Sequence, residues 1–331
     1  IDSATWRSLE ISQTIRSGSR EGSLLGVIDR SATPMGSRLL GDWLANPLTQ
    51  VGAIENRLDA IAEMVADSKL RKGLRHSLGE VYDLQRLVAR AATGRASPRD
   101  LDCVARTLAR LPAIKAKLTG RKSKCLNQLE LDLDLCVSLR TELGKALADN
   151  CPPNTKDGGY IKQGYHAELD DLRQLASGGK QWIANYQKTI CEQTSIPSLK
   201  VGYNKVFGYY LEVTHTHRDK IPAEFIRKQT LKNAERFITP ELKEYEEKVL
   251  SAENQALELE QKLFDQLREM VQAQTSRLKA NAEIIATLDA ICGLAQLAAE
   301  QNYCRPVIVN DSVLSIKQGR HPVLDIIEPL G

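Results

Sequence analysis

The spacing of apolar residues along this chain changes twice, and those two changes limit the folds that it can adopt. From about residue 165 to residue 193, apolar side chains recur every three or four positions, which predicts a long helix. Gly178-Gly179 lies inside this helix and should weaken or bend it. From 198 to 238 they alternate with a period of two, which is typical of strands. The three-four spacing returns at Pro240 and continues to Met270. We therefore expect a small β-unit inserted between two long, antiparallel helices.

The β-unit is predicted to contain four strands that form two hairpins. The segment SLKVGYNKVFGYYLEVTH at 198–215 reads as a strand, a turn at Gly202–Lys205 and a second strand. Residues 225–238 repeat this pattern, with a turn near Leu231–Asn233. Pro240 then begins the longest helix of the chain, because Pro is favoured in a first helical turn.

The rest of the chain reads as a helical core. Apolar residues recur at three-four spacing between 23 and 148, and again between 275 and 302. A cluster of Pro, Gly, Asn and Asp at 149–159 is the clearest loop. The final segment, 306–331, reads as two strands. The predicted fold class is mostly α: a multi-helix core in which two long antiparallel helices carry a small inserted antiparallel β domain.

A group of cations marks the turns of the β-unit. Residues 225–238 contain four cations and a single acid, Glu235. Because the whole chain has a formal net charge of only +3, any basic site has to be local. Cations and amides on a protruding tip suit contacts with phosphates. The candidate nucleic-acid-binding residues are Asn204, Lys205, Lys228, Lys232, Asn233 and Arg236. The alternative is that these charges protect an exposed sheet edge from pairing with another chain.

Other features argue against several classes of site. The seven cysteines form no Cys-x-x-Cys pair, which indicates free thiols in a reducing compartment. His215 and His217 share a face of an expected strand but lack a third ligand, so no metal is predicted. Gly144-Lys145 and Gly179-Lys180 lack the rest of a phosphate-binding P-loop, so we predict no catalytic residue and no cofactor. No apolar run approaches the ~20 residues that span a bilayer.

Four segments resemble the MutS family of DNA mismatch-repair proteins. They are DRSATPMGSRLLGDWLANPL at 29–48, GYNKVFGYYLEVT at 202–214, TLKNAERFITPELKEYEEKVL at 230–250 and GRHPVLD at 319–325. Their order and spacing also match, over essentially all 331 residues. The resemblance implies a core or lever domain interrupted by a clamp domain, which grips duplex DNA without reading the mismatch. The implied boundaries are 1–195 and 240–305 for the two parts of the core/lever domain, 196–239 for the clamp domain, and 306–331 for strands that lead into an ATPase domain outside this chain.

The resemblance also implies what surrounds this chain in the intact family. A mismatch-reading domain with a Phe-x-Glu motif and a connector domain would precede residue 1. An ATPase domain that uses ATP and magnesium would follow residue 331. The implied partners are double-stranded DNA, a second copy of the protein in a homodimer and a MutL-type repair protein, and the implied location is the bacterial cytoplasm at the nucleoid. The chain itself would be a DNA-binding, signal-transmitting fragment without enzymatic activity.

Two alternatives remain open from the sequence. The first is a helical scaffold that binds another protein and whose basic turns have no role in binding. The second is a branch of the same family that lacks mismatch recognition. The region that would precede residue 1 discriminates this branch from the rest of the family.

Overall fold

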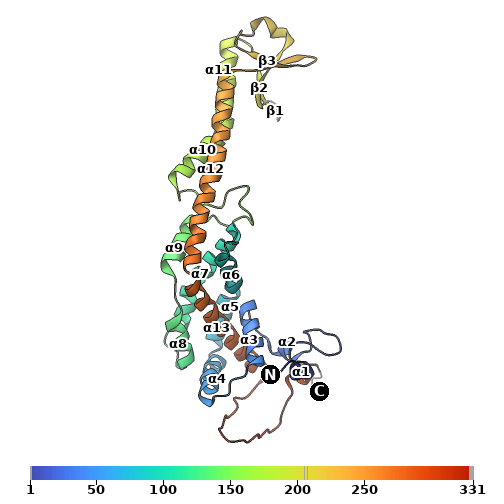
Figure 1. Cartoon of the computed structure of the whole chain (residues 1–331), viewed down its shortest axis with the longest axis vertical. Coiled ribbons are helices and arrows are strands. Elements are labelled where there is room, and N and C mark those ends of the chain that lie inside the picture. The colour runs from blue at the N-terminus through green and yellow to red at the C-terminus, as the bar shows by residue number, and fades with distance from the viewer. Residues whose placement is uncertain (1, 205, 207, 328–331) are drawn as a thin grey trace. The chain divides into compact units, whose positions relative to one another are not determined.

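The computed structural model describes residues 2–204, 206 and 208–327, and the chain forms two compact units. Unit 1 comprises Ile1–Pro153 and Leu267–Gly331, and unit 2 comprises Asn154–Gln266. Figure 1 shows a mostly helical chain with one small sheet. The predicted fold class is confirmed, because a four-stranded antiparallel sheet is inserted between long helices.

Unit 1 is built from helices in the part of the chain that the structure describes. They are α1 (Ser3–Ser8), α2 (Leu24–Ile28), α3 (Pro34–Ala45), α4 (Val51–Ala66), α5 (Ser68–Gly79), α6 (Leu84–Ala92), α7 (Pro98–Leu118), α8 (Lys124–Asp132), α9 (Val137–Ala146), α13 (Thr275–Gln301) and α14 (Pro322–Ile327). Helices α3, α4, α5 and α6 all pack against α13. This arrangement makes α13 the central helix of the unit.

Helix α13 can occupy the centre because it carries apolar side chains on all sides. Leu278, Ile285, Leu288 and Ile291 are fully buried. Contrary to the expectation from the sequence, α13 is long and apolar enough to cross a membrane by length and composition alone, but 67% of its most apolar stretch is buried inside the protein. That burial is typical of a core helix.

Two buried polar residues on α13 hold loops in place. The Asp289 carboxylate accepts the N–H groups of Ala32 at 2.8 Å and Thr33 at 2.7 Å, and also the Thr33 hydroxyl at 2.7 Å. Burial raises the pKa of the Asp289 carboxyl, against the effect of these hydrogen bonds. Asn281 accepts the N–H of Asp134 at 3.0 Å and donates to its carbonyl at 2.7 Å. These contacts fix the segments that lead into α3 and α9.

Unit 2 contains the sheet and the helices next to it in sequence. Its elements are α10 (Ala167–Ser177), α11 (Gly179–Thr194), β1 (Lys200–Asn204), β2 (Gly208–Thr214), the 3₁₀ helix η1 (His215–Lys220), β3 (Ile226–Thr230), β4 (Ala234–Ile238) and most of α12 (Pro240–Ala273). The expected helix over 165–193 is divided where Gly178-Gly179 was expected to weaken or bend it. Helix α12 is continuous over 34 residues, as predicted.

The sheet has strand order β1-β2-β4-β3, and one of its faces packs on the helices. Leu211, Val213 and Phe237 from the sheet form a core with Tyr186 of α11 and Leu242 of α12. Helices α11 and α12 lie side by side in Figure 1, and Trp182 of α11 stacks on Tyr245 of α12 with ring centroids 3.6 Å apart. The sheet is therefore attached to both helices by one apolar core.

The first hairpin turns later than the sequence suggested. Gly202 lies inside β1, opposite Tyr210, and the strands pair as far as Asn204 and Gly208. Gly202 is required by close approach, since a Cβ there would lie 2.6 Å from the Tyr210 ring. Gly208 follows the turn with a φ of +80°, a conformation that favours glycine. The sequence prediction assigned Gly202 to the turn, whereas in the structure Gly202 lies in β1 and the glycine beside the turn is Gly208.

Two further expectations about strands are corrected by the structure. Within 306–327 no strand is formed, and Pro322–Ile327 is a short helix. A strand needs a hydrogen-bonded neighbour, and alternating residues alone do not supply one. His215 and His217 lie in the 3₁₀ helix η1 and not on a strand, because β2 ends at Thr214.

We expect Gly36→Ala to destabilise unit 1 by about 2–3 kcal/mol, because it adds a methyl group to a packed site. A Cβ at Gly36 would lie 2.3 Å from Oδ2 of Asp289, the carboxylate that holds the start of α3. The measurement is urea unfolding followed by circular dichroism.

Gly144→Ala is the matched control for this substitution. Gly144 lies in α9, and a Cβ there would meet no heavy atom of the described residues within 4 Å. The control should stabilise the protein by about 0.5–1 kcal/mol, as Ala does in a helix interior. Equal unfolding midpoints for the two variants would contradict the assigned role of the Gly36–Asp289 contact.

Candidate nucleic-acid interface

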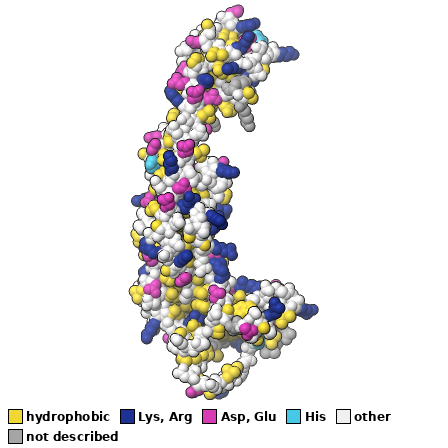
Figure 2. Space-filling model, in the orientation of Figure 1, with side chains coloured by type: hydrophobic (Ala, Val, Ile, Leu, Met, Phe, Trp, Pro, Cys, Tyr) yellow, Lys and Arg dark blue, Asp and Glu magenta, His cyan; other side chains and the backbone are white. Residues whose placement is uncertain are grey.

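The β-unit concentrates the positive charge of the chain. Residues 196–239 contain eight Lys and Arg against four Asp and Glu, a net charge of +4, whereas the whole chain carries +3. All other residues together are therefore slightly negative. Figure 2 shows Lys and Arg side chains protruding from the sheet region. Such a local basic surface is the electrostatic signature of phosphate binding.

Lys228 lies at a bulge in the edge strand β3. Arg227 pairs with Phe237 and Gln229 pairs with Arg236, so the register leaves Lys228 without a partner in β4. A bulge turns a side chain away from the regular pleat. Every residue of β3 is exposed, and no ion pair among the described residues includes Lys228.

The turn between β3 and β4 presents Lys232 and Asn233 to solvent. Its backbone is held by other groups: the Leu231 N–H donates to the Ala234 carbonyl at 2.8 Å, and the His215 N–H donates to the Asn233 carbonyl at 3.3 Å. The His215 ring also lies 3.1 Å from the Leu231 carbonyl oxygen. Because main-chain and histidine groups fix the turn, the two exposed side chains are not needed for its shape.

Arg236 differs from the other candidates, because it binds residues of the sheet itself. Its Nε donates to Glu212 at 3.0 Å, and its Nη1 donates to Gln229 at 2.9 Å. The guanidinium carbon lies 4.4 Å from the centre of the Tyr210 ring. Only 20% of the Arg236 side chain is exposed, so it ties β2, β3 and β4 together on one face.

The structure does not bring all the candidates together. Asn204 ends β1, where its Oδ1 accepts the Val206 N–H at 2.7 Å, and Lys205 lies outside the described residues. In the register, Asn204 is opposite the first residue of β2, whereas the β3–β4 turn adjoins the last. The two turns therefore lie at opposite ends of the sheet, about 20 Å apart along β2. The sequence could not show that the two turns are separated, because their separation follows from the order and register of the strands.

Two further cations near the β3–β4 turn, Arg218 and Arg227, were not among the candidates. Glu235 on β4 is buried, and its Oε1 lies 3.5 Å from Arg227 Nη1 and 3.9 Å from Arg218 Nε. Two exposed arginines thus share one buried carboxylate, which leaves a net positive charge at the surface. Arg218 comes from η1, and the signal that could have found it is the basic run His217-Arg218 followed by Lys220.

These residues form what we name the basic end of the sheet. It consists of Arg218, Arg227, Lys228, Lys232 and Asn233. Arg236 supports it from within the sheet, and Asn204 lies at the other end.

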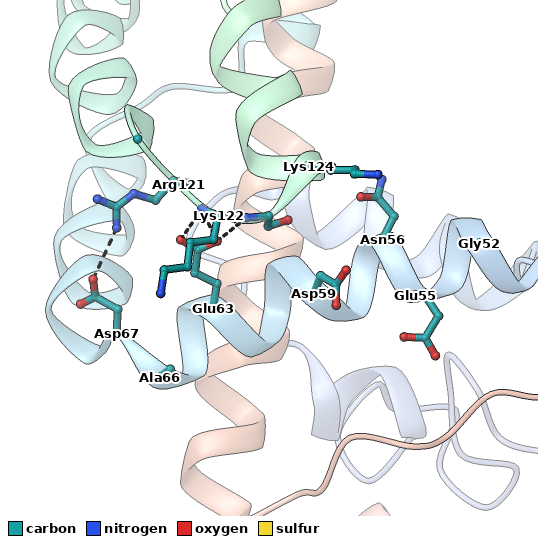
Figure 3. A pocket seen from close by; sticks show the side chains of 12 residues that line it. Gly52, Glu55, Asn56, Asp59, Glu63, Ala66, Asp67, Arg121, Lys122 and Lys124 are labelled. Atoms are coloured by element: carbon teal, nitrogen blue, oxygen red, sulfur yellow. Dashed lines mark hydrogen bonds and ion pairs between the residues drawn. The ribbon is translucent and has the colours of Figure 1, made fainter.

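A groove in unit 1 is lined by three cations and four acids, so it has no net positive charge. It has a volume of about 980 Å³ and lies between α4 and the segment that precedes α8 (Figure 3). The Glu63 carboxylate accepts the N–H groups of Lys122 and Ser123, at 3.0 and 2.7 Å, and Asp67 pairs with Arg121 at 3.5 Å. The start of α8, where a phosphate could otherwise bind, is therefore filled by a side chain of the protein. Among the described residues no cluster of His, Cys, Asp or Glu could hold a metal ion.

The fold agrees with the family found by sequence comparison. The profile of MutS domain III matches residues 4–295. A small sheet inserted in the sequence between long helices is what the resemblance implied. The chain belongs to the MutS family, of which it contains domain III.

Several relatives share this stretch of sequence. "DNA mismatch repair protein MutS" of Rhodopirellula baltica is 57% identical over 326 residues, which cover 98% of this chain and 37% of that protein. The protein of the same name from Salinibacter ruber is 47% identical over 331 residues, which cover all of this chain and 36% of that protein. In Symbiobacterium thermophilum the identity is 45% over 325 residues, covering 98% of this chain and 37% of that protein. The chain spans little more than a third of the length of these relatives.

Arg236→Ala should destabilise the sheet by about 1 kcal/mol, because it removes a partly buried ion pair and leaves Glu212 unpaired. Lys232→Ala is the matched control and should change the free energy of unfolding by less than about 0.5 kcal/mol, as exposed turn residues do. Urea unfolding of the two variants checks this. If both unfold at the same midpoint, Arg236 does not hold the strands together.

Proposed function

We propose that this chain is the part of a MutS-type mismatch-repair ATPase that grips duplex DNA and transmits a signal along the protein. The observation that carries the proposal is the basic end of the sheet, in a chain that belongs to the MutS family. Relatives that share the whole stretch are named DNA mismatch repair proteins.

The chemistry of the basic end suits phosphates better than bases. Lys228 and Lys232 are point charges on flexible stems, located on an edge strand and a turn. Reading bases requires side chains on an element that enters the major groove. That element is usually a helix or a two-stranded ribbon. Lysines on an edge strand and a turn hold the backbone of any sequence about equally. The proposed contact is therefore independent of the mismatch.

Helix α12 supports the proposed role in transmission. Its first turns contribute Leu242 and Tyr245 to the contacts that hold the sheet, and its last turns, from Leu267, belong to unit 1. With 34 residues it is about 50 Å long. A helix without a break can carry a change in position at one end to groups packed at the other. Signal transmission in this sense is a coupling between two sites.

In the intact protein we expect further domains and partners. ATP and magnesium would bind in an ATPase domain outside this chain, and two copies would surround the DNA as a homodimer. A MutL-type repair protein would be the downstream partner, in the bacterial cytoplasm at the nucleoid. The proposed domain boundaries are 1–195 and 240–305 for the core/lever domain, 196–239 for the clamp and 306–331 for the approach to the ATPase domain. On this proposal the chain alone does not hydrolyse ATP.

The double variant Lys228→Ala/Lys232→Ala tests the proposed grip. Each lost phosphate contact lowers the slope of log affinity against log salt by about 0.9 on duplex DNA, so the slope should fall by about 1.8. The loss should be equal on matched and mismatched duplexes. Salt titrations followed by fluorescence anisotropy measure both quantities.

Lys248→Ala is the control for the loss of a cation. Lys248 lies on α12 in the same unit, where it is exposed and paired with Glu244 at 2.8 Å. Its slope should equal that of the unmodified chain. The proposal fails if the double variant keeps the original slope, or if its loss is confined to the mismatched duplex. An unchanged slope would favour the scaffold alternative.

A further inference from the structure

A second basic surface lies in unit 1, where α6 meets α7. Residues 84–99 contain four arginines and no Asp or Glu. Arg86 and Arg90 are one turn apart on α6, Arg95 lies in the connection, and Arg99 is in the first turn of α7. All four side chains are exposed. We name this group the arginine corner.

The carboxylates that pair with the arginine corner lie beneath it. Asp83 is 15% exposed while its partner Arg86 is 78% exposed. Asp100 is 12% exposed while its partner Arg90 is 56% exposed. Each acid is also bound elsewhere: Asp83 pairs with Arg38 at 2.7 Å, and Asp100 accepts the N–H and hydroxyl of its helix cap, Ser97. The surface therefore presents guanidinium groups to solvent and keeps its acids covered.

Arg95 and Arg99 differ from the other two. Within the described parts of the chain, neither has a carboxylate oxygen within 4.0 Å of its guanidinium group. An exposed arginine without an acidic partner keeps its full charge and all five donors. Replacing these two residues therefore removes charge from the surface without breaking an ion pair.

The backbone of the arginine corner is fixed from several sides. Gly94 has a φ of +68°, and the Arg95 N–H donates to the Arg90 carbonyl at 2.9 Å. Gln272, from the last turn of α12, donates to the Ala92 carbonyl at 3.3 Å. The Arg99 N–H donates to the Pro152 carbonyl at 3.2 Å. A surface held in this way presents its charges in a constant arrangement, which lowers the entropy lost on binding.

We infer that the arginine corner is a second contact for the phosphate backbone of a nucleic acid duplex. Guanidinium groups match phosphate oxygens with two parallel hydrogen bonds, and this surface uses arginine alone. The rise between Arg86 and Arg90 is about 6 Å, which corresponds to about two nucleotides of one strand at 3.4 Å each. The exposed residues between the arginines are small, such as Ala89, Ala92 and Thr93, so a backbone can approach closely.

An acidic protein is the other class of partner that four arginines could bind. Protein interfaces depend on buried aromatic or large apolar anchors. The stretch 84–99 contains no aromatic residue; of its large apolar residues, Leu84 and Val88 are buried in unit 1 and Leu87 is half-buried. The surface thus offers charge without an anchor, which favours a nucleic acid. All residues of the arginine corner belong to unit 1, so its role does not depend on the one proposed for the basic end of the sheet.

The experiment compares Arg95→Gln/Arg99→Gln with a matched control, Arg7→Gln/Arg16→Gln. The control removes two exposed arginines from the same unit, so the net charge changes equally. Both pairs are made in the unmodified chain and in the Lys228→Ala/Lys232→Ala background. Salt titrations on a 40-base-pair duplex, by fluorescence anisotropy, give the log–log slope for each. An unchanged urea midpoint verifies that every variant is folded.

The arginine corner variant should lower the slope by about 1.8 in both backgrounds, as two lost phosphate contacts would. Between 50 and 200 mM salt, the affinity of the variant should therefore fall about tenfold less than the affinity of its parent does. The control pair should leave the slope unchanged. A loss in the corner variant without one in the lysine variant would support this inference and contradict the proposed grip, and the reverse result would do the opposite.

Two results would overturn the inference. One is a corner variant whose slope equals that of the control pair. The other is an unchanged slope on DNA together with lost binding to polyglutamate, which would assign the surface to an acidic protein.

Discussion

Buried carboxylates on the long helices hold the connecting segments of this protein in place. Glu260 of α12 is 2% exposed and accepts the N–H groups of Gly159, Tyr160 and Ile161 at 3.0, 2.8 and 2.8 Å. It also pairs with Arg173 of α10 at 2.8 Å. A buried charge is costly unless it is hydrogen-bonded and paired, and here three N–H donors and one guanidinium group converge on one carboxylate. The loop that precedes α10, α10 itself and α12 are thereby fixed to one another inside unit 2.

The same device appears on α13, where Asp289 binds the segment before α3. In both places small residues surround the carboxylate: a Cβ at Gly36 would clash with Asp289, and one at Gly158 would lie 2.7 Å from Glu260. Apolar packing alone lets a helix slide or rotate by small amounts at low cost. A carboxylate that matches a particular set of N–H groups allows a single register, because a shift would leave the charge buried without donors. The long helices are therefore fixed by polar contacts and stabilised by apolar ones.

The sequence predicted those parts of the fold that depend on local spacing. The change of period revealed the sheet and the continuous α12, and Gly178-Gly179 marked where the preceding helix divides. Features set by distant partners were missed or wrong. Strands at 306–321 require neighbours that alternation does not provide, and the turn assigned to Gly202 ignored the Tyr210 ring that covers it.

The candidate site shows the same division. Counting charges found Lys228 and Lys232, but it could not show that Arg236 pairs with Glu212. It also could not place Asn204 at the other end of the sheet, because that follows from the order of the strands. The arginines of 84–99 show a further limit of the sequence. It does not reveal whether the acid that pairs with a surface arginine lies beside it, facing solvent, or beneath it. The difference lies in depth: when the acid lies beneath the guanidinium, the pair fixes the orientation of the arginine while its charge still faces solvent. The ion pair orients each such arginine, and an anion can bind its exposed side without breaking the pair.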